Sequence, residues 1–235
     1  MKLTVIIVAG GKGLRMGGDL PKQFIPLQGK PVLMHTVETF YKWDSSACII
    51  IVIPEEHESY WKMLCKELNF TVPHRIVYGG ETRFQSVLNG LREAEDEGLI
   101  AVHDGVRPFV SQEVISSCFK VAKFFGTAIP VIPMIESVRE ITGRKKGDIF
   151  EGSFVGESRP LNRSRLCIVQ TPQVFKSEIL RKAYEQPYDR FFTDDASLVE
   201  ASGHPIRLVE GNRENIKITT PMDLQYALYQ LTMES

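Results

Sequence analysis

Short, mostly apolar runs rich in β-branched residues alternate with longer stretches in which apolar residues recur every three or four positions. The first pattern is typical of strands buried on both faces, and the second of helices with one buried face. Strands are predicted at 3–8, 48–53, 75–77, 100–103, 127–131, 167–170 and 205–209, and helices at 32–41, 57–68, 82–97, 112–125 and from Pro221 onward. This alternation predicts an α/β fold of Rossmann-like type, in which helices cover both faces of a mostly parallel sheet.

One segment interrupts the alternation. Residues 136–165 are polar, rich in Arg, Lys and Gly, and poor in apolar periodicity. Within this segment, 138–141 and 149–155 have the composition to pair as a hairpin, although two strands alone are marginally stable. We therefore predict one domain formed by 1–135 and 166–235. Residues 136–165 are inserted into it as a protruding β-arm, which either lies in solvent or is fixed by another subunit.

Composition excludes several classes of protein. The chain has 235 residues and a formal net charge of −1. This charge argues against nucleic-acid binding, which normally requires a basic surface excess. No stretch approaches the roughly 20 apolar residues of a membrane span, and the apolar start runs at once into Gly10, so no signal peptide is predicted. The four cysteines are widely spaced and are interpreted as reduced residues. These features predict a soluble, cytoplasmic protein.

A glycine-rich loop at 9–18 follows the first predicted strand. Open parallel sheets bind their ligands at this edge. The dinucleotide-binding fingerprint G-x-G-x-x-G does not fit, because Gly11 and Gly13 are followed by Met16 where the third glycine should stand. The Walker A motif does not fit either, since no Gly-Lys-Ser/Thr closes the loop.

Two cations accompany this loop, Arg15 within it and Lys22 seven residues further on. Glycines let a backbone approach a phosphate chain and direct N–H groups at its oxygens. Arginine and lysine offset the charge that builds up on a phosphorus under attack. The alternative is a turn with two solvated cations, but the offsets of Arg15 and of Pro21-Lys22-Gln23 favour nucleotide binding and transfer.

The string from Ala9 to Phe24 resembles the start of the nucleotidyltransferases that make activated sugars and polyols. It is most similar to the 2-C-methyl-D-erythritol 4-phosphate cytidylyltransferase family of the non-mevalonate isoprenoid pathway. Further blocks follow the order of that family, so the resemblance covers about residues 3–224. These blocks are GGETRFQS at 79–86, VHDGVRP at 102–108, QTPQ at 170–173, TDDAS at 193–197 and the segment 209–219.

The resemblance implies an enzyme that uses Mg²⁺ or another divalent cation. It would attach the cytidylyl group of CTP to 2-C-methyl-D-erythritol 4-phosphate and release pyrophosphate. The ribitol 5-phosphate cytidylyltransferases share nearly every motif and are the nearest alternative. A non-catalytic nucleotide-binding module is a remote alternative, against which the presence of Arg15, Lys22 and Lys217 argues. The family also implies a homodimer formed through the arm.

Roles for individual residues follow from the same resemblance. The residues implied to bind CTP are Ala9, Gly10, Gly11, Gly13, Gly80 and Ser86, and the catalytic ones are Arg15, Lys22 and Lys217. Those implied to bind the second substrate are Asp104, Arg107, Ser137, Arg163 and Thr171. Asp104 is also the candidate metal ligand, and Ser137, on the arm, would reach the site of the partner subunit.

Some of these positions have a structural alternative. Ser86 is alternatively a hydroxyl on a helix surface, and Asp104 and Arg107 alternatively form a purely structural ion pair. Arg83 either reaches a phosphate or anchors its turn. His103 is interpreted as a packed residue at a strand end, because the attacking phosphate is already an oxyanion at neutral pH and needs no base.

The consecutive acids Asp194 and Asp195 are open to a misreading as a two-carboxylate catalytic site. A helix that begins here, with Thr193 as its N-cap and the acids in its first turn, explains them structurally. An outer role for Asp194 around the site is the alternative.

Overall fold

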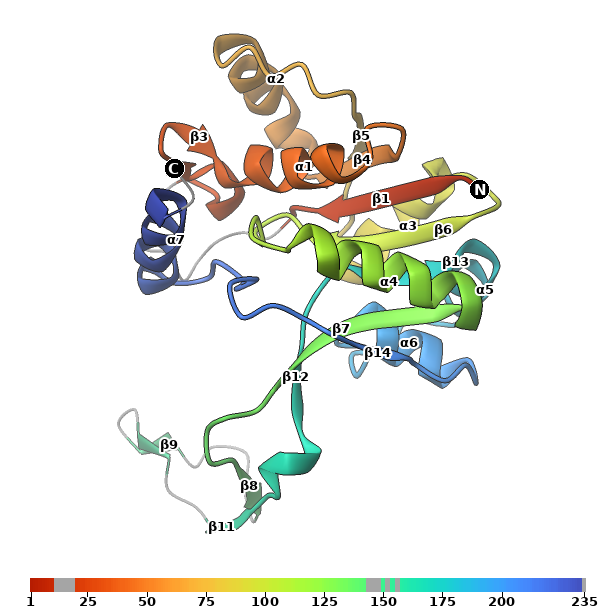
Figure 1. Ribbon diagram of the computed structural model, residues 1–235, viewed down its shortest axis with the longest axis vertical. Coiled ribbons are helices and arrows are strands. Elements are labelled where there is room, and N and C mark those ends of the chain that lie inside the picture. The colour runs from red at the N-terminus through yellow and green to blue at the C-terminus, as the bar shows by residue number, and fades with distance from the viewer. Residues whose placement is uncertain (11–19, 143–148, 151–152, 155–156, 234–235) are drawn as a thin grey trace.

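A mixed, mostly parallel sheet forms the centre of the computed structural model, which describes residues 1–10, 20–142, 149–150, 153–154 and 157–233 (Figure 1). Its strand order is β12-β7-β13-β6-β1-β4-β5, and β14 pairs with β7 off this path. Strands β1, β4, β5 and β6 are mutually parallel, whereas β13 runs antiparallel to both β6 and β7. The strands are β1 (Leu3–Val8), β4 (Cys48–Ile53), β5 (Arg75–Tyr78), β6 (Leu99–Asp104), β7 (Thr127–Pro133), β12 (Cys167–Val169), β13 (Gln173–Lys176) and β14 (Leu208–Glu210).

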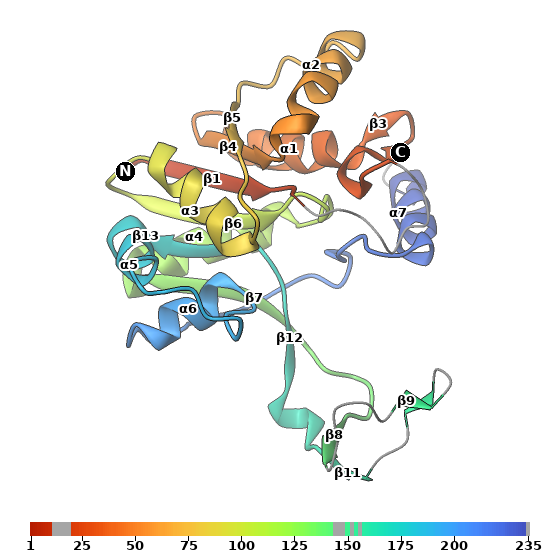
Figure 2. The same ribbon diagram turned by 180° about the vertical axis from the view of Figure 1, so that it is seen from behind.

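Helices cover both faces of this sheet, as Figures 1 and 2 show from opposite sides. One face carries α1 (Val32–Trp43), α2 (Glu58–Glu67) and α4 (Gln112–Phe125), and the other carries α3 (Arg83–Glu93), α5 (Ser177–Ala183) and α6 (Asp195–Ala201). Successive strand residues point to opposite faces, so Val5 and Ile7 join one core cluster while Ile6 joins the other. The predicted fold class is confirmed.

Smaller elements complete the body of the protein. The C-terminal helix α7 (Pro221–Met233) forms a third apolar cluster with residues around the short hairpin of β2 (Pro26–Leu27) and β3 (Lys30–Pro31). Three single-turn helices lie at Lys22–Phe24 (η2), Glu55–His57 (η3) and Arg163–Arg165 (η4). Within the described part of the chain, no helix combines the length and apolarity that crossing a bilayer requires.

Among the described strands of the central sheet and the helices that cover it, β13 and α5 were not predicted. The predicted strand at 205–209 is also misplaced, because β14 begins at Leu208. Ahead of it the Thr127 hydroxyl donates to the Pro205 carbonyl at 2.8 Å and accepts from the Arg207 N–H at 3.2 Å. A side chain therefore satisfies the backbone there in place of a strand ladder.

The inserted segment leaves the sheet between β7 and β12 and projects away from the body (Figures 1 and 2). In it, β8 (Arg139–Thr142) pairs antiparallel with β11 (Glu157–Pro160), and β9 (Ile149–Phe150) pairs with β10 (Ser153–Phe154). The predicted pairing of 138–141 with 149–155 is therefore wrong. Polar strands without a buried face specify their pairing register only weakly. In the β8–β11 pair, the contacts of Arg159 with Glu140 and of Arg139 with Ser158 support the observed register.

Candidate active site

The carboxyl ends of three parallel strands bring together segments that are far apart in the sequence. Strand β1 leads into Ala9-Gly10, β5 into Gly79-Gly80, and β6 ends at Asp104. A cavity of about 220 Å³ opens at this edge. Its lining consists of Val8, Ala9, Gly10, Lys22, Gln23, Gly80, Glu81, Thr82, Arg83, Ser86, Asp104, Val106 and Lys217.

One wall of the cavity is built by Ser86 and the loop ahead of α3. The buried Ser86 hydroxyl accepts from the Gly80 N–H at 3.1 Å and donates to the Thr82 carbonyl at 2.9 Å. Thr82 also caps α3 in a reciprocal capping box with Gln85. A Cβ at Gly79 would lie 3.0 Å from the Ser86 oxygen, so glycine permits this close approach. Ser86 thus holds the Gly80–Thr82 loop in place through these two hydrogen bonds. Its recognition of the cytosine base stays a prediction.

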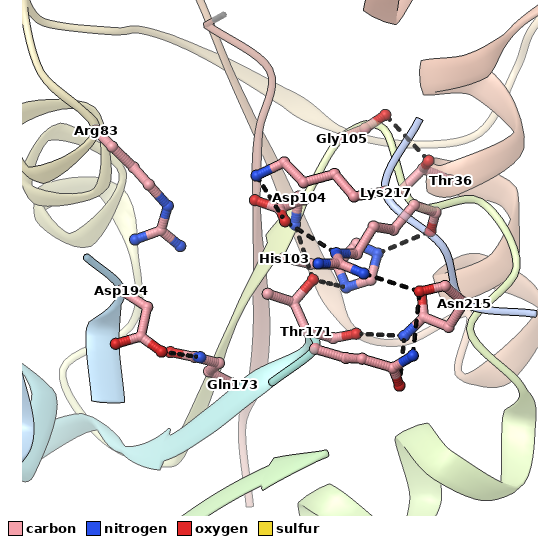
Figure 3. A network of polar contacts seen from close by, with 12 residues as sticks. Thr36, Arg83, His103, Asp104, Gly105, Thr171, Gln173, Asp194, Asn215 and Lys217 are labelled. Carbon is pink, nitrogen blue, oxygen red and sulfur yellow. Dashed lines mark hydrogen bonds and ion pairs between the residues drawn. The ribbon is translucent and has the colours of Figure 1, made fainter. Parts of the chain in front are cut away.

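Cations surround the Asp104 carboxylate, which lines the same cavity (Figure 3). Oδ2 of Asp104 lies 3.0 Å from Nε of Arg107 and 3.1 Å from Nζ of Lys217. Burial by itself would raise the pKa of Asp104, but Lys217, Arg107 and Arg83 outweigh it and hold the pKa well below its usual value. The ion pair with Arg107 exists, and Lys217 makes it a three-member charge network.

Thr171 fixes the backbone beneath this network. Its hydroxyl accepts from the Asp104 N–H at 3.1 Å and lies 3.0 Å from Nδ1 of His103. The other ring nitrogen of His103 lies 3.0 Å from the Arg107 carbonyl, which can only accept, so Nε2 carries the proton and Nδ1 accepts from Thr171. Burial lowers the pKa of His103 to about 4. His103 is therefore neutral and packed, as its position at the strand end indicated, and a substrate contact by Thr171 stays a prediction.

Two buried amides that sequence reasoning did not single out support Thr171 in turn. Asn215 donates from Nδ2 to the Thr171 carbonyl at 2.8 Å (Figure 3). Gln170 donates from Nε2 to the Asn212 carbonyl at 2.8 Å. The Asn215 carbonyl accepts from Arg107 at 2.8 Å. Both amides belong to blocks that carry the family resemblance, 170–173 and 209–219, but neither was assigned a role from the sequence.

Arg83 lies between this site and α6. Its Nη2 forms an ion pair of 2.6 Å with Asp195, which is fully buried and also accepts from the Tyr184 hydroxyl at 2.6 Å. Burial would lower the pKa of Arg83, but the Asp195 carboxylate outweighs it and raises the pKa above its usual value. The contact with Asp195 supports the anchoring interpretation of Arg83, whose guanidinium also lines the cavity.

The predicted N-cap of α6 is wrong by one residue. Asp194, and not Thr193, caps the helix, because its Oδ1 accepts from the Ser197 N–H at 2.9 Å while the Ser197 hydroxyl accepts from the Asp194 N–H. Its second oxygen accepts from Nε2 of Gln173 at 2.8 Å (Figure 3). Asp195 does fall in the first turn, as expected.

A second cavity of about 240 Å³ adjoins the first and shares Arg83, Asp104 and Lys217 with it. Three of its lining residues bear cations, so it suits an anionic ligand beside the first. The complete lining consists of Arg83, Asp104, Arg107, Val169, Gln170, Thr171, Gln173, Thr193, Asp194 and Lys217.

The remaining predicted site residues lie elsewhere. Ser137 is exposed just ahead of β8, and Arg163 is exposed in η4, where it donates to the Ile135 carbonyl. Neither residue lines either cavity within its own chain. The predicted residues Gly11, Gly13 and Arg15 lie outside the described residues.

Proteins of one known family resemble this chain in sequence and in fold. The sequence model of the 2-C-methyl-D-erythritol 4-phosphate cytidylyltransferase family matches residues 3–233. A protein of that name from Phocaeicola vulgatus is 56% identical over 97% of this chain and 98% of its own, and one from Bacteroides thetaiotaomicron is 54% identical over 96% and 97%. The crystal structure of 2-C-methyl-D-erythritol 4-phosphate cytidylyltransferase from Thermus thermophilus is 30% identical, with a TM-score of 0.77 over 99% of this chain and all of its own. The chain therefore belongs to the 2-C-methyl-D-erythritol 4-phosphate cytidylyltransferase family.

Proposed function

We propose that this protein transfers the cytidylyl group of CTP to 2-C-methyl-D-erythritol 4-phosphate and releases pyrophosphate. The observation that carries the proposal is the pair of adjoining cavities that share Arg83, Asp104 and Lys217. A transfer between two phosphate compounds needs two anion sites with cations at their junction. The names of the relatives supply the two substrates.

The chemistry is an in-line displacement at phosphorus. An oxygen of the polyol phosphate forms a bond to the α-phosphorus of CTP, and the bond from that phosphorus to the bridging oxygen of pyrophosphate breaks. Lys22, Lys217 and Arg15 would neutralise the charge on the reacting phosphates, and Asp104 would orient Lys217 through the 3.1 Å contact. The attacking oxygen is already anionic at neutral pH, so the neutral His103 is not required as a base.

Magnesium fits this site as an ion that arrives with the nucleotide. Among the described residues, no group of three or more His, Cys, Asp or Glu side chains is placed to hold a metal. Mg²⁺ commonly binds one or two carboxylates together with substrate phosphates. Asp104 would offer Oδ1, because Oδ2 already faces Arg107 and Lys217. When bound, the ion would offset charge on the phosphate oxygens.

We also propose that the arm, residues 136–165, joins two copies of this chain. Its exposed Ser137 lines neither cavity of its own chain, so a role at such a site would fall in the site of a second copy. Sedimentation velocity should give a dimer for the full chain and a monomer after replacement of 139–160 by a short glycine-serine turn. A monomeric full chain would refute the arm proposal and leave the proposed reaction untouched.

The reaction is tested by pyrophosphate release with CTP and Mg²⁺. Rates with 2-C-methyl-D-erythritol 4-phosphate should exceed those with ribitol 5-phosphate, and Lys22→Ala should lower kcat far more than it raises KM for the polyol. Lys123→Ala on the exposed side of α4 is the matched control. A preference for ribitol 5-phosphate would replace the substrate, and CTP binding without turnover would identify a non-catalytic nucleotide-binding protein.

A further inference from the structure

Gln23 lines the first cavity, and its buried amide nitrogen lacks a hydrogen-bond partner. The residue is 1% exposed, and its Nε2 has no hydrogen-bond partner among the residues that the structure describes. Two other buried side-chain atoms share this condition, on His57 and Asn215, but these residues line neither of the two cavities. Gln23 is thus the residue that both carries an unmet donor and lines a ligand-sized space.

The chain holds Gln23 firmly in this place. It occupies the single turn η2 between Lys22 and Phe24. Phe24 is 2% exposed, and its ring meets the ring of Tyr60 edge-on with centroids 5.2 Å apart. The packing of Phe24 limits the freedom of the Gln23 backbone next to it.

Two other glutamines show what this fold does with a buried amide. Gln173 is equally buried, and it donates to Asp194 at 2.8 Å while accepting from the Ala196 N–H at 2.9 Å. Gln170 donates to two backbone carbonyls. Buried amides are normally satisfied in this way, since an unmet donor costs free energy. The Nε2 donor of Gln23 is an exception, and its acceptor would have to come from outside the described residues.

The chemistry of the cavity defines that acceptor. Of the charged side chains that line the same cavity as Gln23, Lys22 and Lys217 only donate, and Asp104 Oδ2 already faces two cations. An N–H donor in a cavity that two lysines also line fits an anionic oxygen, and a hydrogen bond to a charged acceptor is stronger than one between neutral groups. We propose that Gln23 donates from Nε2 to a phosphate oxygen of the bound nucleoside triphosphate. This rests on the proposed function of the cavity as the CTP site.

The test compares the same substitution at a satisfied and an unsatisfied buried glutamine. Gln23→Met keeps the length of the side chain but removes the donor, and Gln173→Met does so where both amide atoms are bonded. Thermal unfolding without ligand should show an unchanged or higher Tm for Gln23→Met and a lower Tm for Gln173→Met. Calorimetric titration with CTP should give a Kd roughly tenfold or more higher for Gln23→Met than for wild type.

Titration with 2-C-methyl-D-erythritol 4-phosphate distinguishes the two sources of phosphate. A loss of affinity for CTP supports the inference, and a loss confined to the polyol phosphate overturns it. A lower Tm with unchanged CTP affinity would show a purely structural role. Gln23→Glu, in which a carboxylate faces the phosphate, should bind CTP more weakly still, and equal binding by both variants and wild type would also overturn the inference. Turnover by wild type tests the proposed function separately, because the titrations require no turnover.

Discussion

Removal of the Thr171 hydroxyl tests the support beneath Asp104. The hydroxyl satisfies two buried groups, the Asp104 N–H at 3.1 Å and Nδ1 of His103 at 3.0 Å. Thr171→Val replaces it by a methyl group of similar size, so no cavity forms and both groups lose their partner. Each unmet buried group costs about 1–3 kcal/mol, so the loss of both should lower the free energy of unfolding by about 2–6 kcal/mol.

Thr171→Ser is the matched control, because it keeps the hydroxyl and loses only one methyl group, worth about 1 kcal/mol. Urea unfolding at pH 7.5, followed by far-ultraviolet circular dichroism, should rank the proteins as wild type, then Ser, then Val. Pyrophosphate release should follow the same order, because the Asp104 backbone depends on the hydroxyl. A Val variant as stable as wild type, or a Ser variant less stable than Val, would refute the reasoning.

Three further predictions concern other parts of the chain. Gly98→Ala should be severely destabilising in urea unfolding, because φ is +113° and the added Cβ would lie 2.1 Å from a backbone oxygen just ahead of β1. Gly203→Ala, where φ is +88° but the space is open, should lower the free energy of unfolding by only about 1 kcal/mol. Equal losses in the two variants would contradict this reasoning. Tyr184→Phe should cost about 1.5–3 kcal/mol by the same measurement, because it removes the donor to the buried Asp195, and an unchanged midpoint would contradict it. His103 has its pKa lowered from 6.5 to about 4, so the unfolded state binds its proton first; stability should fall by about 1.4 kcal/mol per pH unit as pH drops from about 6.5 to 4. In His103→Asn, the slope of the free energy of unfolding against pH should be smaller over this range by the equivalent of about one proton taken up on unfolding. An unchanged slope would contradict the conclusion that His103 is neutral in the folded protein.

The parts of the fold that sequence predicted best are those governed by local pattern. The bounds of β1 and β4 match the predicted strands because both are continuous β-branched runs buried on two faces. The four-residue β13 was missed, since its outer residues are Gln173 and Lys176 and a proline precedes it. Its burial depends on β6 and β7 on either side, which no local pattern records.

The candidate site likewise contains residues that the sequence pointed to and contacts that it did not. Gly10, Gly80 and Asp104 were assigned to a ligand site through the family resemblance, and they lie at one cavity because parallel strands end at one edge of the sheet. Contacts made across long sequence separations were not predictable. Arg83 and Asp195 are 112 positions apart, and nothing near either residue indicates which cation will neutralise the buried acid.

The antiparallel strand β13 has a consequence for the order in which a growing chain can fold. Strands β1, β4, β5 and β6 lie within the first 104 residues and pair with one another, so half of the sheet can assemble early in synthesis. Strand β13 then inserts between β6 and β7 only after the arm has been made. Until then the apolar β6 is an open edge, which is the kind of surface that aggregates. Lys217 is synthesised later still. A chain truncated before Lys217 would keep the cavity wall formed by Gly10 and Gly80 but would lose the cation beside Asp104.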